Sequence, residues 1–457
     1  MWVGFVLAHV WLTRLGSLVL LNQSFGDVDL YRRWMEAGLT QGWWPVLDEA
    51  WVYPAGAIVP LLAPTLVAGT AAGGAYVLGW CVLVTALDAL AVSALLRRPG
   101  GHVAAAWWLA FLVLLGPVAI GRLDSVVAPL SVLALLAALS SPRASAALVT
   151  AGAWVKVSPG AAIVPLALAA RRPWRDVVAP AAAVCVVVVG TVVALGGGRN
   201  VASFVLEQGS RGLQIESVGA TPWLVAGLWS PAVQRYLNSE LVTYEIAGPG
   251  TQGMADVLGA GLVVGVLLAS AVLWWCRRRD GAAFWTDDAL RGDFVVRGAF
   301  LMALVLIVAN KVGSPQFMTW LAPPVAVALA LRRPWWGRTA LVVAGIAAAT
   351  QVVYPWWYLD VLYGRPAVTL LLAARNVALV VLLVVTVVHL LRPPHAADEA
   401  RVGRVRVGRA RPRATTEVVT GDGPAEGRSE QDPSGAVGGE PGEQVGPRAP
   451  VVDRGVG

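Results

Sequence analysis

Long apolar segments constrain this chain more than any other feature of its sequence. They recur along most of its 457 residues, with lengths of roughly 17 to 25 residues, which is what a helix needs to cross the hydrocarbon core of a bilayer. Hydrophobic residues make up 57% of the chain and charged residues only 14%, whereas an average soluble domain has about 25% charged residues. A water-soluble fold would have too little polar surface to cover itself, so the sequence predicts one all-α polytopic membrane domain.

The arginines predict how the segments are oriented, because short cytoplasmic loops retain lysine and arginine. Basic clusters stand at the ends of apolar segments: Arg97 with Arg98, Arg143, Arg171 with Arg172 and Arg175, Arg277 with Arg278 and Arg279, Arg332 with Arg333, and Arg392. Between them, alternating crossings are expected at 2–21, 76–96, 104–119, 126–139, 177–195, 257–276, 294–309, 320–331, 339–353 and 368–391. With irregular segments, this gives about 10 to 12 transmembrane helices. The net charge of +7 then reflects topology, and no nucleic-acid partner is predicted.

Two apolar stretches are too short to cross a bilayer. Between Arg143 and Arg171, which should lie on the same side, a polar break at 156–160 divides the apolar sequence. Each half has about a dozen residues, so we expect a re-entrant helical hairpin surrounded by protein or by a wet cavity. The segment 58–68 is also short, and it is expected to lie along the outer surface.

The predicted outer connections 22–57 and 196–255 are long and rich in aromatic residues. Loops of this length usually carry function, and their aromatic content argues against disorder. After Arg392 the composition changes to Gly, Pro, Glu and Arg, which cannot bury a core. We therefore expect a membrane domain at 1–391 and a disordered cytoplasmic tail at 392–457, with the basic part 402–413 near anionic lipid headgroups.

Residues suited to chemistry gather in five short strings, four on the predicted outer side and one at the turn of the hairpin. The strings are 26–31, followed by Tyr53-Pro54; 121–125; 156–159; 211–217; and 311–316. In this order, over most of residues 1 to 391, they resemble glycosyltransferase family 87, the polyprenyl-phosphate-dependent mannosyltransferases of mycobacteria and their relatives. The family pattern of an aspartate four residues before a tyrosine matches Asp27 and Tyr31 here. Where relatives often have a second proline, this chain reads Tyr53-Pro54-Ala55.

The resemblance implies a GT-C-like multi-helix fold in which a first-loop aspartate is the general base. The donor would be a lipid phosphate sugar that enters sideways from the outer leaflet. The chemistry agrees, because attack by an acceptor hydroxyl on an anomeric carbon needs a positioned carboxylate to accept its proton. Asp27 and Asp29 are the candidates, and on a helix they would point to different sides. One would be the base, and the other would bind sugar hydroxyls or cap a helix. The alternative for Asp27 is that it caps a helix beginning near Leu30.

Cations are needed where negative charge develops on the departing phosphate. Arg211 and Lys311 are the first candidates, and Arg122 and Lys156 are the second. Each can equally serve a structural ion pair, for example Arg122 with Asp124. Amide and carboxylate groups hydrogen-bond well to sugar hydroxyls. The remaining candidate substrate-binding residues are therefore Gln214, Glu216 and Gln316, together with Tyr31, Tyr53 and Asp124.

The string Asp27-Val28-Asp29 also matches the metal-binding doublet of nucleotide-sugar transferases. Nucleotide sugars are cytoplasmic, however, and this loop is predicted to lie outside. The four histidines have no ligand spacing, and the three cysteines lie inside apolar runs. We therefore expect neither a metal nor another cofactor.

Together these inferences predict a multi-pass cell-membrane transferase that moves mannose from polyprenyl-phosphate mannose to a hydroxyl of a lipid or cell-envelope glycan. Inversion is expected, because a single base without a covalent nucleophile gives one displacement. Arabinose and glucose donors are alternatives, since nothing in the sequence reads the sugar's stereochemistry. A lipid or sugar transporter is the rival class. Transporters usually place broken helices in repeated halves, and the hairpin here has no matching second half.

Overall fold

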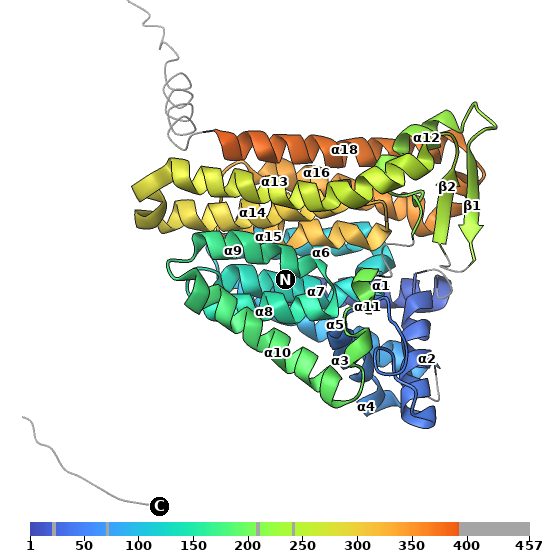
Figure 1. The fold of residues 1–457 in the computed structure, drawn as a ribbon, viewed down its shortest axis with the longest axis horizontal. Helices are drawn as coiled ribbons and strands as arrows, with labels where there is room; N and C mark the ends of the chain where they lie inside the picture. Colours follow the sequence, from blue (N-terminus) through green and yellow to red (C-terminus); the bar gives the residue numbers. More distant parts are fainter. Residues whose placement is uncertain (21–23, 70–72, 207–210, 240–242, 393–457) are drawn as a thin grey trace, which may run out of the picture. The chain divides into compact units, whose positions relative to one another are not determined.

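The computed structural model describes residues 1–20, 24–69, 73–206, 211–239 and 243–392, which form a bundle of helices (Figure 1). Contacts divide the chain into a unit at 1–400 and a second at 401–457. The predicted disordered tail beyond Arg392 lies outside the described residues. Within them, seven helices are long and apolar enough to cross a membrane. The chain is therefore a helical membrane-embedded protein.

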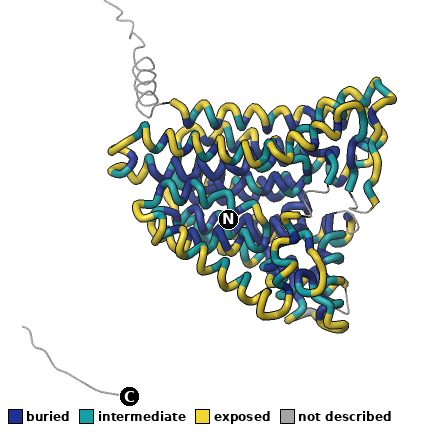
Figure 2. The backbone as a smooth tube through the Cα atoms, in the orientation of Figure 1, coloured by how far each residue is buried: buried dark blue, intermediate teal, exposed yellow. Residues whose placement is uncertain are grey.

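Several of these seven spans combine an α-helix with a short 3-10 or π-helical continuation. They are α1 (Trp2–Arg14) with η1 (Leu15–Val19), α5 (Gly73–Leu96), α6 (Gly101–Leu115) with η3 (Gly116–Ala119), η5 (Trp174–Val178) with α10 (Ala179–Ala194), α13 (Thr251–Thr286), α16 (Trp336–Gln351) with η9 (Val352–Trp356), and α18 (Pro366–Leu391). Along α10 and α13 few residues are buried, and about half or more are exposed (Figure 2). Those that are exposed include Val186, Val187, Leu267 and Leu268. Apolar surface of this extent is typical of a face that lipid covers.

Five further helices pack among these spans. They are α7 (Asp124–Ala137), α8 (Pro142–Val155), α9 (Ile163–Ala169), α14 (Asp288–Val308) and α15 (Ala322–Ala330). Helix α14 packs against α9, α13, α15 and α18, and nearly all of α15 is buried. Helix α14 also carries Arg291, Asp293 and Arg297, and α15 is too short to span a bilayer. The expected total of about 10 to 12 spans therefore stays a prediction.

The predicted hairpin corresponds to α8 and α9. The chain leaves α8 at Lys156, whose backbone is extended, and continues through η4 (Ser158–Ala162) into α9. Arg143 at the start of α8 forms an ion pair with Asp176, which follows α9, with Nε and Oδ1 3.1 Å apart. The two ends of this segment therefore lie side by side, and Lys156 lies at its turn.

The connections predicted to be outer contain most of the remaining elements. They are α2 (Gly26–Gln41), η2 (Ala55–Ala57), α3 (Ile58–Leu62), α4 (Thr65–Ala68), η6 (Gly198–Asn200), α11 (Ser203–Leu206), η7 (Val218–Ala220), α12 (Thr221–Ala226), β1 (Gln234–Asn238), β2 (Thr243–Ala247), η8 (Pro315–Leu321) and α17 (Tyr358–Leu362). Figure 1 shows α2, α12 and both strands at one end of the helices, and the turn between α13 and α14 at the other end.

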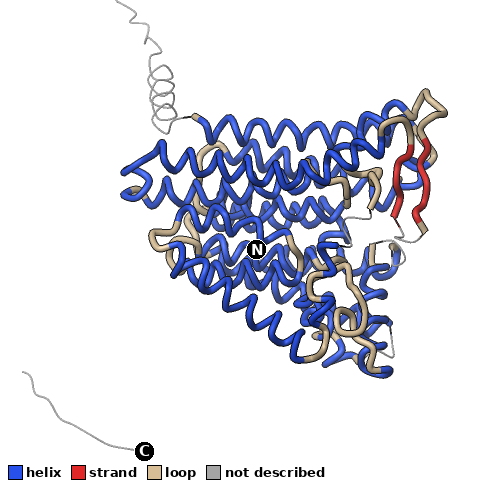
Figure 3. The backbone as a smooth tube through the Cα atoms, in the orientation of Figure 1, coloured by secondary structure: helices blue, strands red, loops and turns tan. Residues whose placement is uncertain are grey.

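The two strands are a departure from the all-α prediction (Figure 3). They pair antiparallel, with Gln234 opposite Ala247 and Asn238 opposite Thr243. The segment 213–215 runs along the other edge of β2, where Ile215 N–H donates to Tyr244 O at 3.2 Å and Ile246 N–H donates to Leu213 O at 2.9 Å. The strands contain Tyr, Thr and Ile, which favour extended structure, and they accompany the short helices of this loop.

Candidate functional site

Asp27 lies in the first turn of α2 and forms an ion pair with Arg122, which stands just before α7. Arg122 Nη2 also donates to the Tyr354 hydroxyl at 3.1 Å, so the guanidinium joins α2 to η9. Burial lowers the pKa of Arg122, but the negative charge of Asp27 raises it above its ordinary value. The Asp27 side chain is 34% exposed. A solvent-accessible carboxylate is thus held in place by a cation that stays charged.

Asp29 belongs to a different group of side chains. Its two oxygens form ion pairs with Arg32 Nε at 3.0 Å and Arg33 Nε at 3.3 Å, both on the same helix. Helix α2 begins at Gly26, four residues earlier than expected, so both aspartates are helical and Asp29 points about 200° away from Asp27. The N-cap of α2 is Phe25, with no side-chain cap bond. The capping role considered for Asp27 is therefore not what the structure shows.

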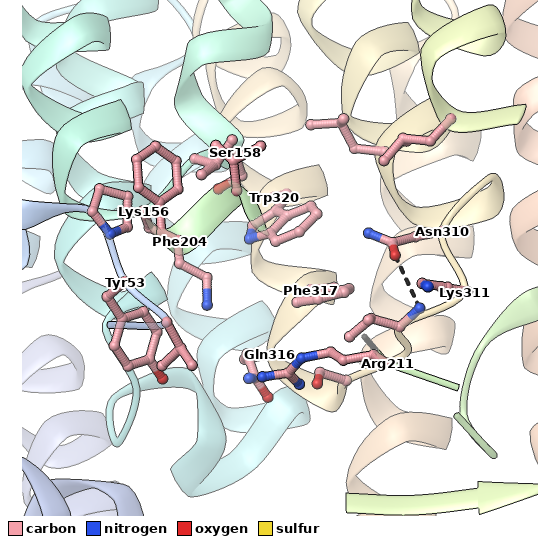
Figure 4. Close-up of a pocket in the computed structure, with 18 of the residues that line it drawn as sticks. Tyr53, Lys156, Ser158, Phe204, Arg211, Asn310, Lys311, Gln316, Phe317 and Trp320 are labelled. Atoms are coloured by element: carbon pink, nitrogen blue, oxygen red, sulfur yellow. Dashed lines mark hydrogen bonds between the residues drawn. The ribbon is translucent and has the colours of Figure 1, made fainter. Parts of the chain in front are cut away.

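A cavity of about 520 Å³ opens beside this cluster (Figure 4). Its wall brings together the segment 52–54, the hairpin turn, α11, Arg211, α13 and the segment 306–320. Figure 4 shows Tyr53 and Lys156 on one side, and Lys311 with the base of Arg211 on the opposite side. Gln316 also lines it. Asp27 is connected to the Tyr53 end of the cavity through Tyr31, which lies one turn further along α2 and whose ring meets that of Tyr53.

Lys156 reaches the cavity from the hairpin turn. Its Nζ lies 3.7 Å from Asp124 Oδ2 and 4.9 Å from the centre of the Tyr53 ring. The other Asp124 oxygen accepts a hydrogen bond from Trp320 Nε1 at 2.6 Å. Burial lowers the pKa of Lys156, but the nearby negative charge, that of Asp124 first, raises it above its ordinary value. Lys156 is therefore a half-buried cation whose charged form is stabilised first of all by Asp124.

The β-hairpin fixes the segment that presents Arg211. The Glu245 carboxylate accepts from Gly212 N–H at 3.1 Å and from the Tyr236 hydroxyl at 2.8 Å. Gln214 N–H donates to Lys311 O at 3.0 Å, so this segment also holds the loop that carries Lys311. Among the described residues, the buried Arg211 Nε and Gln214 Nε2 atoms have no hydrogen-bond partner. An anion or a hydroxyl can meet such donors.

Glu216 lies away from this cavity. It forms a buried ion pair with Arg375 of α18, with 3.0 Å between Oε2 and Nη1, and Arg375 Nη2 donates to Glu216 O at 2.9 Å. Burial raises the pKa of Glu216 above its ordinary value, although Arg375 opposes the shift. Asn376 extends the network by donating to Ser217 O at 3.3 Å. This network binds the segment 216–217 to α18.

The structure therefore brings most of the candidate residues together. Asp27, Tyr31, Tyr53 and Arg122 form one cluster, in which the rings of Tyr31 and Tyr53 meet edge to face at 6.3 Å. A second group around the cavity contains Asp124, Lys156, Arg211, Lys311 and Gln316, with Gln214 behind it. Asp29 and Glu216 lie outside both groups.

Sequence reasoning missed Tyr354, Trp320, Glu245 and Arg375. Arg375 had a usable signal, because an arginine inside a predicted span is expensive and usually has a specific partner. A second signal was the rarity of lysine: of the 35 lysines and arginines in the chain, only Lys156 and Lys311 are lysine. Both line this cavity.

No protein-family model matches the sequence, and a comparison with curated proteins finds no match either. Within the described residues, no group of three or more His, Cys, Asp or Glu is placed to hold a metal ion. The function is therefore inferred from the residues and their geometry.

Proposed function

We propose that the protein is an integral membrane glycosyltransferase. It moves mannose from polyprenyl-phosphate mannose to a hydroxyl of a lipid or glycan acceptor. The observation that carries this proposal is the cavity, which has cations on facing walls and an apolar side, and whose Tyr53 end contacts Tyr31, one turn from Asp27 on α2. An amphipathic anion with a reactive centre near its charged group is the ligand that such a cavity fits.

The apolar side of the cavity suits a lipid chain. It is formed by Phe204 of α11 and by Leu258 and Leu262 of α13. Val157 and Val205, which also line the cavity, are 51% and 59% exposed. These features support entry of the lipid donor from the side, through the membrane.

The charged groups suit displacement at the anomeric carbon. As the acceptor oxygen bonds to this carbon, its proton passes to the Asp27 carboxylate. The bond between the anomeric carbon and the phosphate oxygen breaks, and its electron pair stays on the phosphate. Arg211 and Lys311 then meet the growing negative charge in a poorly solvated cavity, where fixed cations are most effective. A single displacement of this kind inverts the anomeric centre.

Arg122 orients the base in this scheme. It holds Asp27 through the ion pair and is itself fixed by Tyr354. Tyr53 lies beside Lys156 and Tyr31 and offers an aromatic wall for the sugar. Gln316 offers an amide to its hydroxyls.

The distribution of charge supports an extracytoplasmic site in the cell membrane. The basic cluster Arg277, Arg278 and Arg279 lies near the turn between α13 and α14, at the end of the bundle opposite α2 and the β-hairpin (Figure 1). Basic loops are retained in the cytoplasm. Mannose is proposed on the family resemblance, and arabinose and glucose are the alternatives to test.

The experiment is transfer by purified protein in proteoliposomes supplied with polyprenyl-phosphate mannose, arabinose or glucose, each radiolabelled, and with a lipid extract as acceptor. Transfer of mannose, with inverted anomeric configuration in the product, is expected. Transfer of only another sugar corrects the donor. Binding of the lipid donors without any transfer overturns the enzyme proposal and favours a lipid transporter.

A further inference from the structure

The two lysines of this chain share one cavity, although 35 residues of the chain are lysine or arginine. Arginine is always charged, whereas a lysine ammonium in an apolar site loses its proton unless a neighbour stabilises it. Lys156 has such a neighbour in Asp124, at 3.7 Å.

Asp124 is 1% exposed and is not among the residues that line the cavity. Its carboxylate is shared between two groups that do line it, the Lys156 ammonium and the Trp320 indole N–H. The Trp320 ring in turn stacks on Phe317, with 4.1 Å between ring centres. A residue outside the cavity thus fixes one cation and one aromatic wall inside it.

The same short segment also controls the proposed base. Arg122, two residues before Asp124, forms the ion pair with Asp27. Two residues at the start of α7, Arg122 just before it and Asp124 in its first turn, therefore contact the carboxylate that accepts the proton and the Lys156 ammonium.

We propose that Asp124 is a positioning residue that keeps the Lys156 ammonium protonated and directed into the cavity before the lipid donor arrives. This inference rests on the proposed function for its ligand, an anionic lipid phosphate. The dependence of the protonation and position of Lys156 on Asp124 can be tested without that ligand.

The charged and titratable groups around Lys156 determine whether its pKa rises or falls. They are Asp124 from α7, Tyr53 from the first outer loop, Asp27 from α2 and Arg211 from the segment before β1. Burial and the positive charge of Arg211 lower the pKa of Lys156, and the other three groups raise it, with Asp124 first. In Asp124→Asn, burial and Arg211 still lower the pKa of Lys156, but the Asp124 charge, which raises this pKa most, is lost. The ammonium then loses its proton at a lower pH.

The test measures acylation of the two lysines by mass spectrometry of peptides, in intact protein in detergent, as a function of pH. The neutral amine is the reactive form, and Lys311 is an internal reference. In the wild type, the midpoint for Lys156 is expected above the ordinary lysine value of about 10.4. In Asp124→Asn it is expected to fall by about one pH unit or more, because the ion pair is lost in a buried site.

The control is Trp320→Phe, which removes the indole donor but keeps the ion pair, and which should leave the Lys156 midpoint within a few tenths of a unit. An unchanged midpoint in Asp124→Asn overturns the proposal. If that variant does not fold, a wild-type midpoint for Lys156 below the ordinary lysine value overturns it equally.

A second readout uses polyprenyl phosphate as the probe. Its affinity for Asp124→Asn is expected to fall with rising pH about one unit earlier than its affinity for the wild type, and Asp124→Asn with Lys156→Arg should lose this early fall because arginine stays charged. Absence of binding by the wild type contradicts the proposed function, whereas the acylation result still decides the role of Asp124. If the double variant binds polyprenyl phosphate weakly while the wild type binds it strongly, the charge at position 156 does not explain the loss in Asp124→Asn.

Discussion

Asp27 and Asp29 are separated by one residue of α2, yet their carboxylates form ion pairs in different places. Asp27 meets Arg122, which comes from the segment before α7, and Asp29 meets Arg32 and Arg33 of its own helix. Only the Asp27 carboxylate therefore contacts a residue from another part of the chain. The structure thus gives the two aspartates separate partners, which the sequence alone left open.

Transfer is expected to be independent of metal ions. The two aspartates point to different partners and do not converge as a metal doublet, and the proposed leaving phosphate faces Arg211 and Lys311. Activity measured after treatment with EDTA should stay within about twofold of the untreated value, because cations from the protein take the metal's electrostatic role. Loss of activity that magnesium or manganese restores would contradict this expectation.

Neutralising the cavity cations should slow the chemical step. Arg211→Gln or Lys311→Gln removes a fixed charge from the leaving phosphate, so kcat is expected to fall by about 100-fold to 1,000-fold. The matched control is Arg33→Gln, which removes an equal charge from the exposed side of α2. Rates at saturating donor concentration make the comparison. Equal losses in all three variants would show a general effect of net charge instead.

The buried pair of Glu216 and Arg375 should matter for stability and should do so in a pH-dependent way. In Arg375→Gln the Glu216 carboxylate stays buried without its cation, and breaking such a pair costs about 3 to 5 kcal/mol. Burial already raises the pKa of Glu216 above its ordinary value, and loss of Arg375 raises it further. A raised carboxyl pKa favours the folded state below the unfolded pKa, and this contribution is lost as the pH rises through the folded pKa.

Arg375→Gln should therefore be most destabilised at neutral and alkaline pH, and less so near pH 5. The measurement is the thermal unfolding midpoint in detergent, compared between neutral pH and pH 5. The double variant Glu216→Gln with Arg375→Gln is the control, because it removes the buried charge and should lose this pH dependence. A destabilisation of Arg375→Gln that does not change with pH would contradict the account.

The orientation in the membrane can be measured with single cysteines. The native Cys81, Cys185 and Cys276 lie in membrane-spanning helices and can be replaced by alanine. Thr40→Cys on α2 and Thr286→Cys at the end of α13 both introduce exposed positions. An impermeant maleimide added to intact cells should label the first and not the second, because basic loops are retained inside. The opposite labelling would place the cavity on the cytoplasmic side.

The helical membrane class and the turn at Lys156 could be predicted from the sequence, because both depend on the length of uninterrupted apolar runs. The first-loop aspartates and the cations at 211 and 311 were also chosen by residue type. What the sequence could not show was which of them converge. That depends on where α2 begins and on how α7, α8 and η8 pack, since Tyr53, Lys156 and Lys311 come from distant parts of the chain.

Glu216 illustrates the same limit. As a carboxylate in a polar outer string, it was a reasonable sugar binder. In the structure Glu216 forms an ion pair with Arg375, and that contact depends on how the segment around Glu216 packs against α18. The β-hairpin was likewise hidden, because two five-residue strands inside a long loop give only a weak periodic signal.

The most direct test of the central claim compares the wild type, Asp27→Asn and Asp29→Asn, at matched expression in membranes, for transfer of labelled mannose from polyprenyl-phosphate mannose. Loss of the general base should lower the rate of Asp27→Asn by about 100-fold to 10,000-fold, with donor binding retained. Asp29→Asn should stay within severalfold of the wild type, because it breaks only a partly exposed ion pair. Full activity in Asp27→Asn, or loss confined to Asp29→Asn, would contradict the assignment of Asp27 as the base.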